Sequence, residues 1–242
     1  MLEKILDYER DIFICLNSHH TLFENQFMWL FSGKIVWVPV VVTFIVALFC
    51  KNPTYWKESL VFLAAVAMVI TLCDQFSSGI CKPLFVRFRP THHPEFMDNV
   101  QTVFGYRGGS YGFISSHATN AFGFATLTSL IFRYRFYSIM LYLWATVNSY
   151  SRIYLGVHFI SDIIPGIIMG IFFGWLVFKL FVFAREKLFA DNAGIGNKED
   201  FSSIYSRNRL NIILYMLILI IIIMLILSLL YSINFMPAIT LK

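Results

Sequence analysis

A histidine and an aspartate four positions apart, His158 and Asp162, are the residue pair in this chain best suited to chemistry. On a helix, residues at this spacing lie one above the other on a single face. A carboxylate bonded to one imidazole nitrogen fixes the tautomer and leaves the other nitrogen free to act as a nucleophile. Asp162 also opens an apolar run, where an ionised carboxylate is costly and usually functional. The alternative is a purely structural pair, and we favour the functional interpretation.

Two serines and a histidine, Ser115, Ser116 and His117, stand immediately before another apolar run. A serine can cap the start of a helix, and the free backbone N–H groups at a helix start attract anions. His117 would then lie above the helix as a proton donor or acceptor. Taken alone, this cluster is more typical of an ordinary serine cap followed by a histidine at the membrane interface.

Two basic residues, Lys82 and Arg89, are seven positions apart, and Pro90 follows them. On a helix this spacing would place both side chains on one face. Two cations held together repel each other unless an anion lies between them, and the planar guanidinium of arginine suits a phosphate. The alternative is that both side chains only extend from the apolar region to the membrane surface.

Together, the three clusters resemble the signatures of the type-2 phosphatidic acid phosphatase superfamily of lipid phosphate phosphatases. The family motifs are KxxxxxxRP, PSGH and SRxxxxxHxxxD. The first and the third are matched in full, by Lys82, Arg89 and Pro90 and by Ser151, Arg152, His158 and Asp162. The resemblance covers roughly residues 27–183.

The second motif is matched in part, since Ser115 and His117 keep their places while Ile114 replaces the usual proline and Ser116 the usual glycine. Glycine lets a backbone approach an anion without a steric cost, whereas Ser116 must do so with a side chain. Its backbone N–H remains, and its hydroxyl offers a further group for binding phosphate. We therefore expect activity to be retained, with room for a different substrate preference.

The resemblance implies a role for each matched residue. His158 would be the nucleophile that forms a phosphohistidine intermediate, with Asp162 orienting and activating it. His117 would be the general acid that protonates the leaving oxygen. The phosphoryl oxygens would be held by Lys82, Arg89, Arg152 and the backbone of Ser115 and Ser116. Three cations would replace a metal ion, so we expect no cofactor and no metal dependence.

The composition indicates a membrane protein. Of 242 residues, 58% are hydrophobic and 14% charged, and the mean hydropathy is +0.69; a soluble domain usually carries about 25% charge. The net charge is +5, but the basic residues flank apolar runs and form no continuous face of the kind that binds nucleic acid. The four cysteines are irregularly spaced, so neither a zinc site nor a disulfide framework is expected.

The apolar runs predict an all-α bundle of six membrane-spanning helices in one domain, residues 1–242. The expected spans are about 27–50, 60–81, 118–132, 137–150, 160–183 and 211–231, the last a lipid-facing anchor outside the family core. The runs at 118–132 and 137–150 are short for a bilayer, so they should extend into their flanks. Residues 1–17 mix apolar and charged positions in the pattern of an amphipathic helix at the membrane interface.

Alternation of six spans places the N-terminus, the 82–117 loop, the 151–159 turn and the C-terminus on one side. Basic residues favour the cytoplasmic side, and once those assigned to chemistry are set aside, the motifs fall on the outer side. We therefore expect a bacterial inner-membrane protein whose active site faces the periplasm or the exterior. The sequence leaves its oligomeric state open.

The favoured function is hydrolysis of a phosphate or diphosphate on a membrane lipid. We favour a polyprenyl diphosphate such as undecaprenyl diphosphate slightly over lipid A phosphate, with phosphatidylglycerophosphate and phosphatidic acid also compatible. One alternative is a transporter or anion-binding membrane protein without enzymatic activity. The other is an oxidoreductase similar to the vanadate-dependent haloperoxidases, which share this motif set but are soluble.

Overall fold

The chain folds into an all-helical bundle, as predicted. The structure, a computed structural model, describes residues 2–49, 56–189 and 206–235. Within these ranges no β-strand forms, and the only strand-like pairing is an isolated antiparallel bridge between Phe88 and Tyr111. The helices of the first half are α1 (Leu2–Asn17), α2 (Leu22–Ser32), α3 (Val38–Phe49) and α4 (Trp56–Asp74). A π-helical segment (Gln75–Cys81) and α5 (Lys82–Phe85) continue α4, and then come α6 (Ser116–Phe132), α7 (Arg135–Tyr154), α8 (Ile160–Leu188) and α9 (Arg207–Phe235).

The number of membrane spans differs from the expected six. Three segments are long and apolar enough to cross a bilayer: Trp56–Phe85, Ile160–Leu188 and Arg207–Phe235. A bent pair of helices, Leu22–Ser32 with Ile35–Phe49, brings the candidates to four, so a count of six is not confirmed. The helices at the expected runs 118–132 and 137–150, α6 and α7, both extend beyond those runs. However, α6 has only 17 residues, and α7 has an arginine near each end, so neither is among the candidate spans.

The first expected span, 27–50, is broken into two helices. α2 ends at Ser32, Gly33 follows as its C-terminal cap, and α3 begins only after a short 3-10 turn, with a bend of 68° between the two parts. Pro39 is the second residue of α3, where its missing N–H costs nothing. The break places the segment around Gly33 beside the site described below.

Close packing of α6 against α8 forms the centre of the bundle. A Cβ atom on Gly170 would lie 2.5 Å from the backbone oxygen of Thr119, and one on Gly174 would lie 2.7 Å from that of Gly123. Small residues at intervals of four allow helices in a membrane to approach this closely. The two backbones are therefore in contact, which fixes the start of α6 against the start of α8.

Residues 2–17 form helix α1, in which one apolar residue is buried against the protein and its neighbour is exposed. Phe13 is fully buried between Phe96 and Phe159, whereas Ile12 is 51% exposed. Glu9 points toward the bundle and accepts hydrogen bonds there from Arg87 and Ser161. The location of α1 at a membrane interface stays a prediction.

Helix α9 is packed along one side instead of being surrounded by lipid. It lies along α2 and α3, and it buries Leu210, Leu214 and Leu217. Its opposite side is exposed and apolar, as expected of a membrane anchor.

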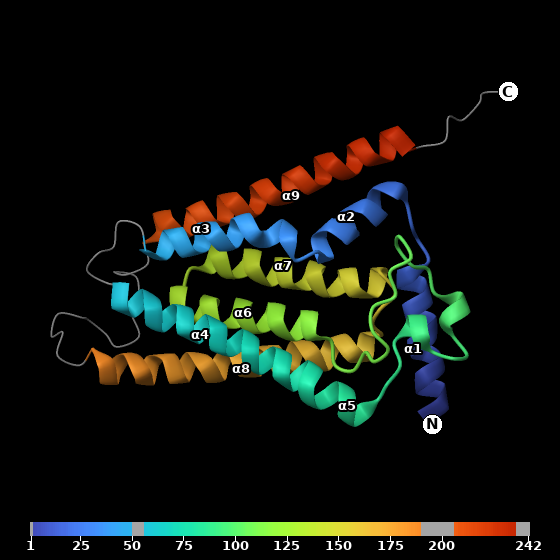
Figure 1. Ribbon diagram of the computed structural model, residues 1–242, viewed down its shortest axis with the longest axis horizontal. Coiled ribbons are helices and arrows are strands. Elements are labelled where there is room, and N and C mark those ends of the chain that lie inside the picture. The colour runs from blue at the N-terminus through green and yellow to red at the C-terminus, as the bar shows by residue number, and fades with distance from the viewer. Residues whose placement is uncertain (1, 50–55, 190–205, 236–242) are drawn as a thin grey trace.

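The bundle brings the expected segments to one end. Figure 1 shows α1, the long connection after α5, the turn between α7 and α8, and the end of α9 at the same end of the bundle. The short turn between α6 and α7 lies at the opposite end of the bundle. The motif-bearing segments thus share one end, as their alternation along the chain predicts.

The α6–α8 contact predicts that Gly170→Ala destabilises the protein, because the added methyl group would collide with the backbone of α6. Overpacking of this kind costs about 1–3 kcal/mol. Thermal unfolding of the purified protein in detergent should show a lower midpoint for Gly170→Ala. Ile168→Ala, at an exposed position of the same helix, should leave the midpoint nearly unchanged, and equal midpoints for the two variants would contradict the packing.

Candidate active site

The predicted His–Asp pair is in contact, but His158 precedes α8 and Asp162 lies in the first turn of that helix. His158 lies in the turn before α8, and its Nδ1 atom is 3.3 Å from Oδ2 of Asp162. The same Oδ2 accepts the backbone N–H of Phe159 at 3.1 Å. The expectation that both residues share one helical face is wrong, because the helix begins at Ile160. The carboxylate instead caps the first turn of α8 and reaches back to the imidazole.

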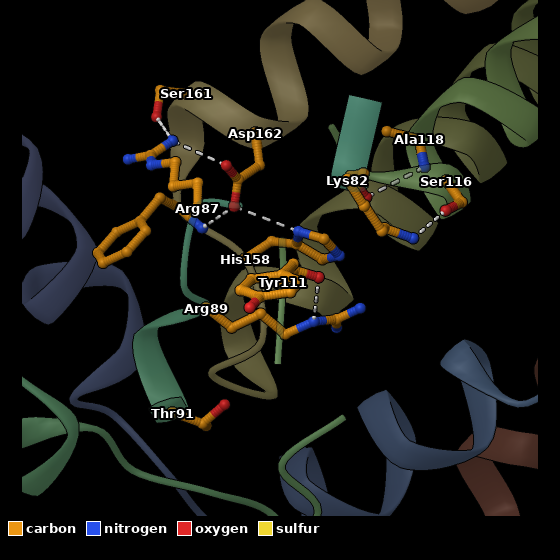
Figure 2. A network of polar contacts seen from close by, with 12 residues as sticks. Lys82, Arg87, Arg89, Thr91, Tyr111, Ser116, Ala118, His158, Ser161 and Asp162 are labelled. Carbon is orange, nitrogen blue, oxygen red and sulfur yellow. Dashed lines mark hydrogen bonds and ion pairs between the residues drawn. The ribbon is translucent and has the colours of Figure 1, made fainter. Parts of the chain in front are cut away.

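Arg87 is a member of the site that the sequence analysis missed. Figure 2 shows Asp162 between Arg87 and His158. Nη1 of Arg87 lies 2.7 Å from Oδ1 of Asp162, and Nη2 lies 2.7 Å from Oε2 of Glu9 on α1. Ser161 also accepts from Arg87 and donates to Glu9. The signal for Arg87 was its position two residues before Arg89, which in an extended chain places both side chains on one side.

Lys82 and Arg89 both reach the site, although not from one helix. α5 ends at Phe85, and Val86 adopts a left-handed conformation with φ 47°, so the predicted shared helical face does not exist. The chain continues extended, and Arg89 N–H donates to the backbone oxygen of Ser110 at 3.0 Å. The guanidinium of Arg89 is fixed by a bond from Nε to the backbone oxygen of Tyr111, also 3.0 Å.

The start of α6 is capped as predicted. Oγ of Ser115 accepts the N–H of Ala118 at 3.4 Å, and the N–H of Ser115 donates to the backbone oxygen of Asp162 at 3.0 Å. This last bond ties the α6 start directly to the α8 start. The next residue, Ser116, accepts Nζ of Lys82 at 2.7 Å.

Arg152 enters from the last turn of α7. It is almost fully buried, and its Nη atoms donate to the hydroxyls of Ser32, at the end of α2, and Tyr106, the latter at 3.2 Å. Both partners are neutral. The break after α2 therefore supplies a hydroxyl that orients Arg152.

One cavity of about 660 Å³ joins these groups. Its polar end is lined by the predicted site residues Lys82, Arg89, Ser116, His117, Arg152 and His158. Among the described residues, none of the three cations forms an ion pair with a carboxylate, and Nη1 of Arg89 and Nε of Arg152 are buried without a hydrogen-bond partner. Unpaired buried cations are costly, and an anion at this end of the cavity would offset that cost. Ser115 and Asp162 do not line the cavity. Ser115 caps α6, and Asp162 contacts the imidazole of His158.

The electrostatic surroundings keep His158 uncharged. Burial lowers its pKa well below the ordinary 6.5, and the basic side chains around it, Arg89 first, lower it further. Since Asp162 pairs with Arg87 and accepts from its other neighbours, Nδ1 of His158 is the donor in their contact. The unprotonated Nε2 atom is then available for bond formation.

Gly112 is a second residue that the sequence analysis did not single out. A Cβ atom there would lie 2.8 Å from Oδ2 of Asp162 and 3.2 Å from Cγ of Arg89. Only a residue without a side chain lets the chain at residues 110–112 pass so close to the His–Asp pair.

Comparison with known proteins identifies the family of this chain. The family model of the PAP2 superfamily matches residues 58–186, more than half of the chain and every predicted site residue. This chain belongs to the PAP2 superfamily. Its fold is also similar to a PAP2-type phosphatidylglycerolphosphate phosphatase from Bacillus subtilis, with 21% identity and a TM-score of 0.52 over 76% of this chain and 88% of that one.

Two curated PAP2 relatives are similar over most of their length, and both are named lipid A 4′-phosphatase. The relative from Porphyromonas gingivalis is 48% identical over 187 residues, 77% of this chain and 78% of its own. The relative from Bacteroides thetaiotaomicron is 41% identical over 192 residues, 78% and 82% of the two chains. The protein is thus an integral membrane lipid phosphatase of the PAP2 superfamily.

The position of Gly112 predicts that Gly112→Ala strongly lowers phosphatase activity, because its methyl group would push Asp162 away from His158. A displacement of about 1 Å can cost roughly 100-fold in rate. Release of inorganic phosphate from a lipid phosphate measures the effect. Gly109→Ala is the matched control, since a Cβ atom there meets no other atom within 4 Å; equal activity of the two variants would contradict this role of Gly112.

Proposed function

We propose that this protein is a lipid A phosphatase that works through a phosphohistidine intermediate. The observation that supports it most directly is a group of three cations without carboxylate partners, the buried Arg89 and Arg152 and the partly buried Lys82, around an uncharged imidazole at the polar end of one cavity. Phosphoryl transfer needs little beyond positioning and stabilisation of charge on the equatorial oxygens. Lys82, Arg89 and Arg152 are placed to bind those oxygens.

In the proposed reaction, Nε2 of His158 attacks phosphorus and the bond to the leaving oxygen breaks. Asp162 keeps the proton on Nδ1 and stabilises the positive charge that develops on the ring. Water then attacks the phosphohistidine and gives its proton to His117, and the P–N bond breaks, which restores both histidines. Arg87 holds Asp162 in place and does not touch the substrate.

His117 is the proposed general acid. It lies in the first turn of α6 and lines the cavity together with His158. Burial first, and then the surrounding cations, disfavour its protonated form, but a bound phosphate dianion would add negative charge beside it. His117 therefore gains its proton together with the substrate and gives it to the leaving oxygen, as efficient acid catalysis near neutral pH requires.

The remainder of the cavity suits a lipid tail. Away from the cations its walls are apolar and come from α3, α4, α6 and α9, through Phe44, Ile45, Val66, Phe124 and Leu217. An apolar groove between membrane helices can hold an acyl or prenyl chain while the phosphate lies at the polar end. A soluble phosphate ester would leave this groove unused.

We propose lipid A phosphate as the substrate, in place of the polyprenyl diphosphate that the sequence analysis slightly favoured. The support is the name shared by the two relatives, which are 48% and 41% identical to this chain.

We propose further that α6 and α7 also cross the bilayer, which gives six spans, and that the site faces the periplasm of an inner membrane. We treat residues 1–242 as one domain, because α1 and α9 both pack on the family core.

The test is phosphate release by the purified protein from lipid A, undecaprenyl diphosphate, phosphatidylglycerophosphate and phosphatidic acid. We expect lipid A to be preferred, activity to persist in EDTA, and His158→Ala to abolish it. Strict dependence on Mg²⁺ would contradict the metal-free scheme.

His117→Ala should slow phosphate release most for substrates with poor leaving groups, because these need a proton from the general acid. An equal loss of rate for all leaving groups would contradict the role of His117 as the acid.

A further inference from the structure

The residues that line the cavity follow the same order on three different helices. From the polar end inward they alternate at intervals of three or four, which is one turn of a helix. On α4 and its continuation they are Lys82, Ser78, Asp74, Ile70, Val66 and Leu63; on α6 they are His117, Asn120 and Phe124; on α7 they are Arg152, Asn148, Trp144 and Leu141. Each helix thus presents an ionic or imidazole group at the polar end, an amide or carboxylate deeper, and apolar side chains beyond it; on the α4 segment, Ser78 lies between Lys82 and Asp74.

The middle level, defined as Asp74, Asn120 and Asn148, has hydrogen-bonding capacity that the protein does not use. Oδ1 of Asn120 is buried without a partner. Among the described residues, the carboxylate of Asp74 forms no hydrogen bond or ion pair, and the side-chain amide of Asn148 none either. Polar groups at this depth in a membrane protein are rare and usually functional. Both Asp74 and Asn120 offer acceptors.

We infer that the middle level binds the hydroxyl and amide N–H groups of a sugar that carries the phosphate. A hexosamine ring offers donors to these acceptors directly beside its phosphate, and its acyl chains would continue into the apolar part of the cavity. A polyprenyl chain begins with methylene groups and would leave the acceptors unsatisfied. A diphosphate would bring its second negative charge toward Asp74, which disfavours it. This inference rests on the proposed function and explains the preference for lipid A.

The test compares two lipids in one preparation of each variant, so that the ratio of their kcat/KM values does not depend on the folded fraction. The lipids are lipid A and phosphatidic acid, which has no hydroxyl or amide donor next to its phosphate. Asn120→Leu should lower the lipid A to phosphatidic acid ratio by roughly ten-fold or more, because a site with unmet polar groups discriminates strongly. Thr71→Val, on α4 and outside the cavity lining, should leave the ratio unchanged.

A second pair of lipids tests the charge. Asp74→Asn should raise kcat/KM for undecaprenyl diphosphate relative to lipid A. Unchanged ratios in both variants, with a wild type that prefers lipid A, would overturn the sugar-binding level and leave the proposed function standing. A wild type that hydrolyses phosphatidic acid but not lipid A would overturn both.

A separate set of contacts concerns α1, which lies outside the residues matched by the family model. The Glu9 carboxylate forms an ion pair with Arg87, in which Oε2 lies 2.7 Å from Nη2. It also accepts hydrogen bonds from the backbone N–H of Ser161, at 3.1 Å, and from the Ser161 hydroxyl. Arg87 in turn holds Asp162. Glu9 therefore fixes both neighbours of the carboxylate that orients His158, although it does not line the cavity itself.

We propose that Glu9 is a positioning residue for the reaction, acting through Arg87 and Ser161. Glu9→Gln keeps the shape and removes the charge. We expect kcat to fall roughly ten-fold, as misplacement of a reacting group predicts, with KM and the lipid ratio unchanged. Since a nearby negative charge favours an imidazolium, its loss should lower the pKa of His158 further and move the acid limb of kcat/KM to lower pH.

Asp11→Asn is the matched control, because Asp11 is an exposed carboxylate on the same helix. It should behave as the wild type in kcat and in the pH profile. The position of the acid limb does not depend on how much protein is folded, so it separates positioning from loss of protein. A Glu9→Gln variant with the kcat and pH profile of Asp11→Asn would overturn the role of Glu9.

Discussion

The site depends on an unequal distribution of opposite charges. Four basic side chains lie around His158, and one of them, Arg87, binds the carboxylates of both Asp162 and Glu9. The other three cations are left with hydroxyl and carbonyl partners. Buried cations normally attract a carboxylate, since burying an unpaired charge is expensive. By engaging both acids, Arg87 keeps the remaining positive charge available for an anion.

Helix packing maintains this separation. The α8 glycines bring α6 and α8 into backbone contact, and the bond from Ser115 N–H to the backbone oxygen of Asp162 aligns the first turns of the two helices. The segment that carries Arg87 and Arg89 is fixed at the isolated bridge between Phe88 and Tyr111. The extended chain there turns Arg87 toward Asp162 and leaves Arg89 at the cavity. Each charge is thus placed by main-chain geometry more than by side-chain contacts.

The sequence predicted the cavity residues better than their supporting structure. Residue type and motif spacing identified Lys82, His117 and His158, because phosphate chemistry limits the side chains that can act. The spacing arguments failed where chain direction changes: Val86 ends the helix between Lys82 and Arg89, and the cap at Phe159 separates His158 from α8. Glu9 could not be found from its surroundings in the sequence, since its partners lie 78 and 152 positions away.

Hydropathy and length do not mark the two central helices, α6 and α7, as membrane spans. α6 buries the threonine side chains of Thr119, Thr126 and Thr128, and α7 buries Asn148 and Arg152. An inner helix surrounded by other helices needs no apolar outer face, and the interior is where polar groups can find partners. The two helices that fall short of a membrane span by composition, α6 and α7, therefore both carry residues of the site. The strongly apolar α9 is the opposite case, with one side on α2 and α3 and the other side exposed.

The departure from the family motif at Ser116 follows from the position of Lys82. The hydroxyl that glycine would lack accepts Nζ of Lys82 at 2.7 Å and contacts the hydroxyl of Ser78 at 2.9 Å. Lys82 also donates to Ser78 at 3.0 Å, so the three groups form one closed cluster. A flexible lysine loses considerable side-chain entropy when it is fixed in one geometry. In this chain the serine holds the ammonium group in advance, and the backbone N–H that glycine would provide is retained.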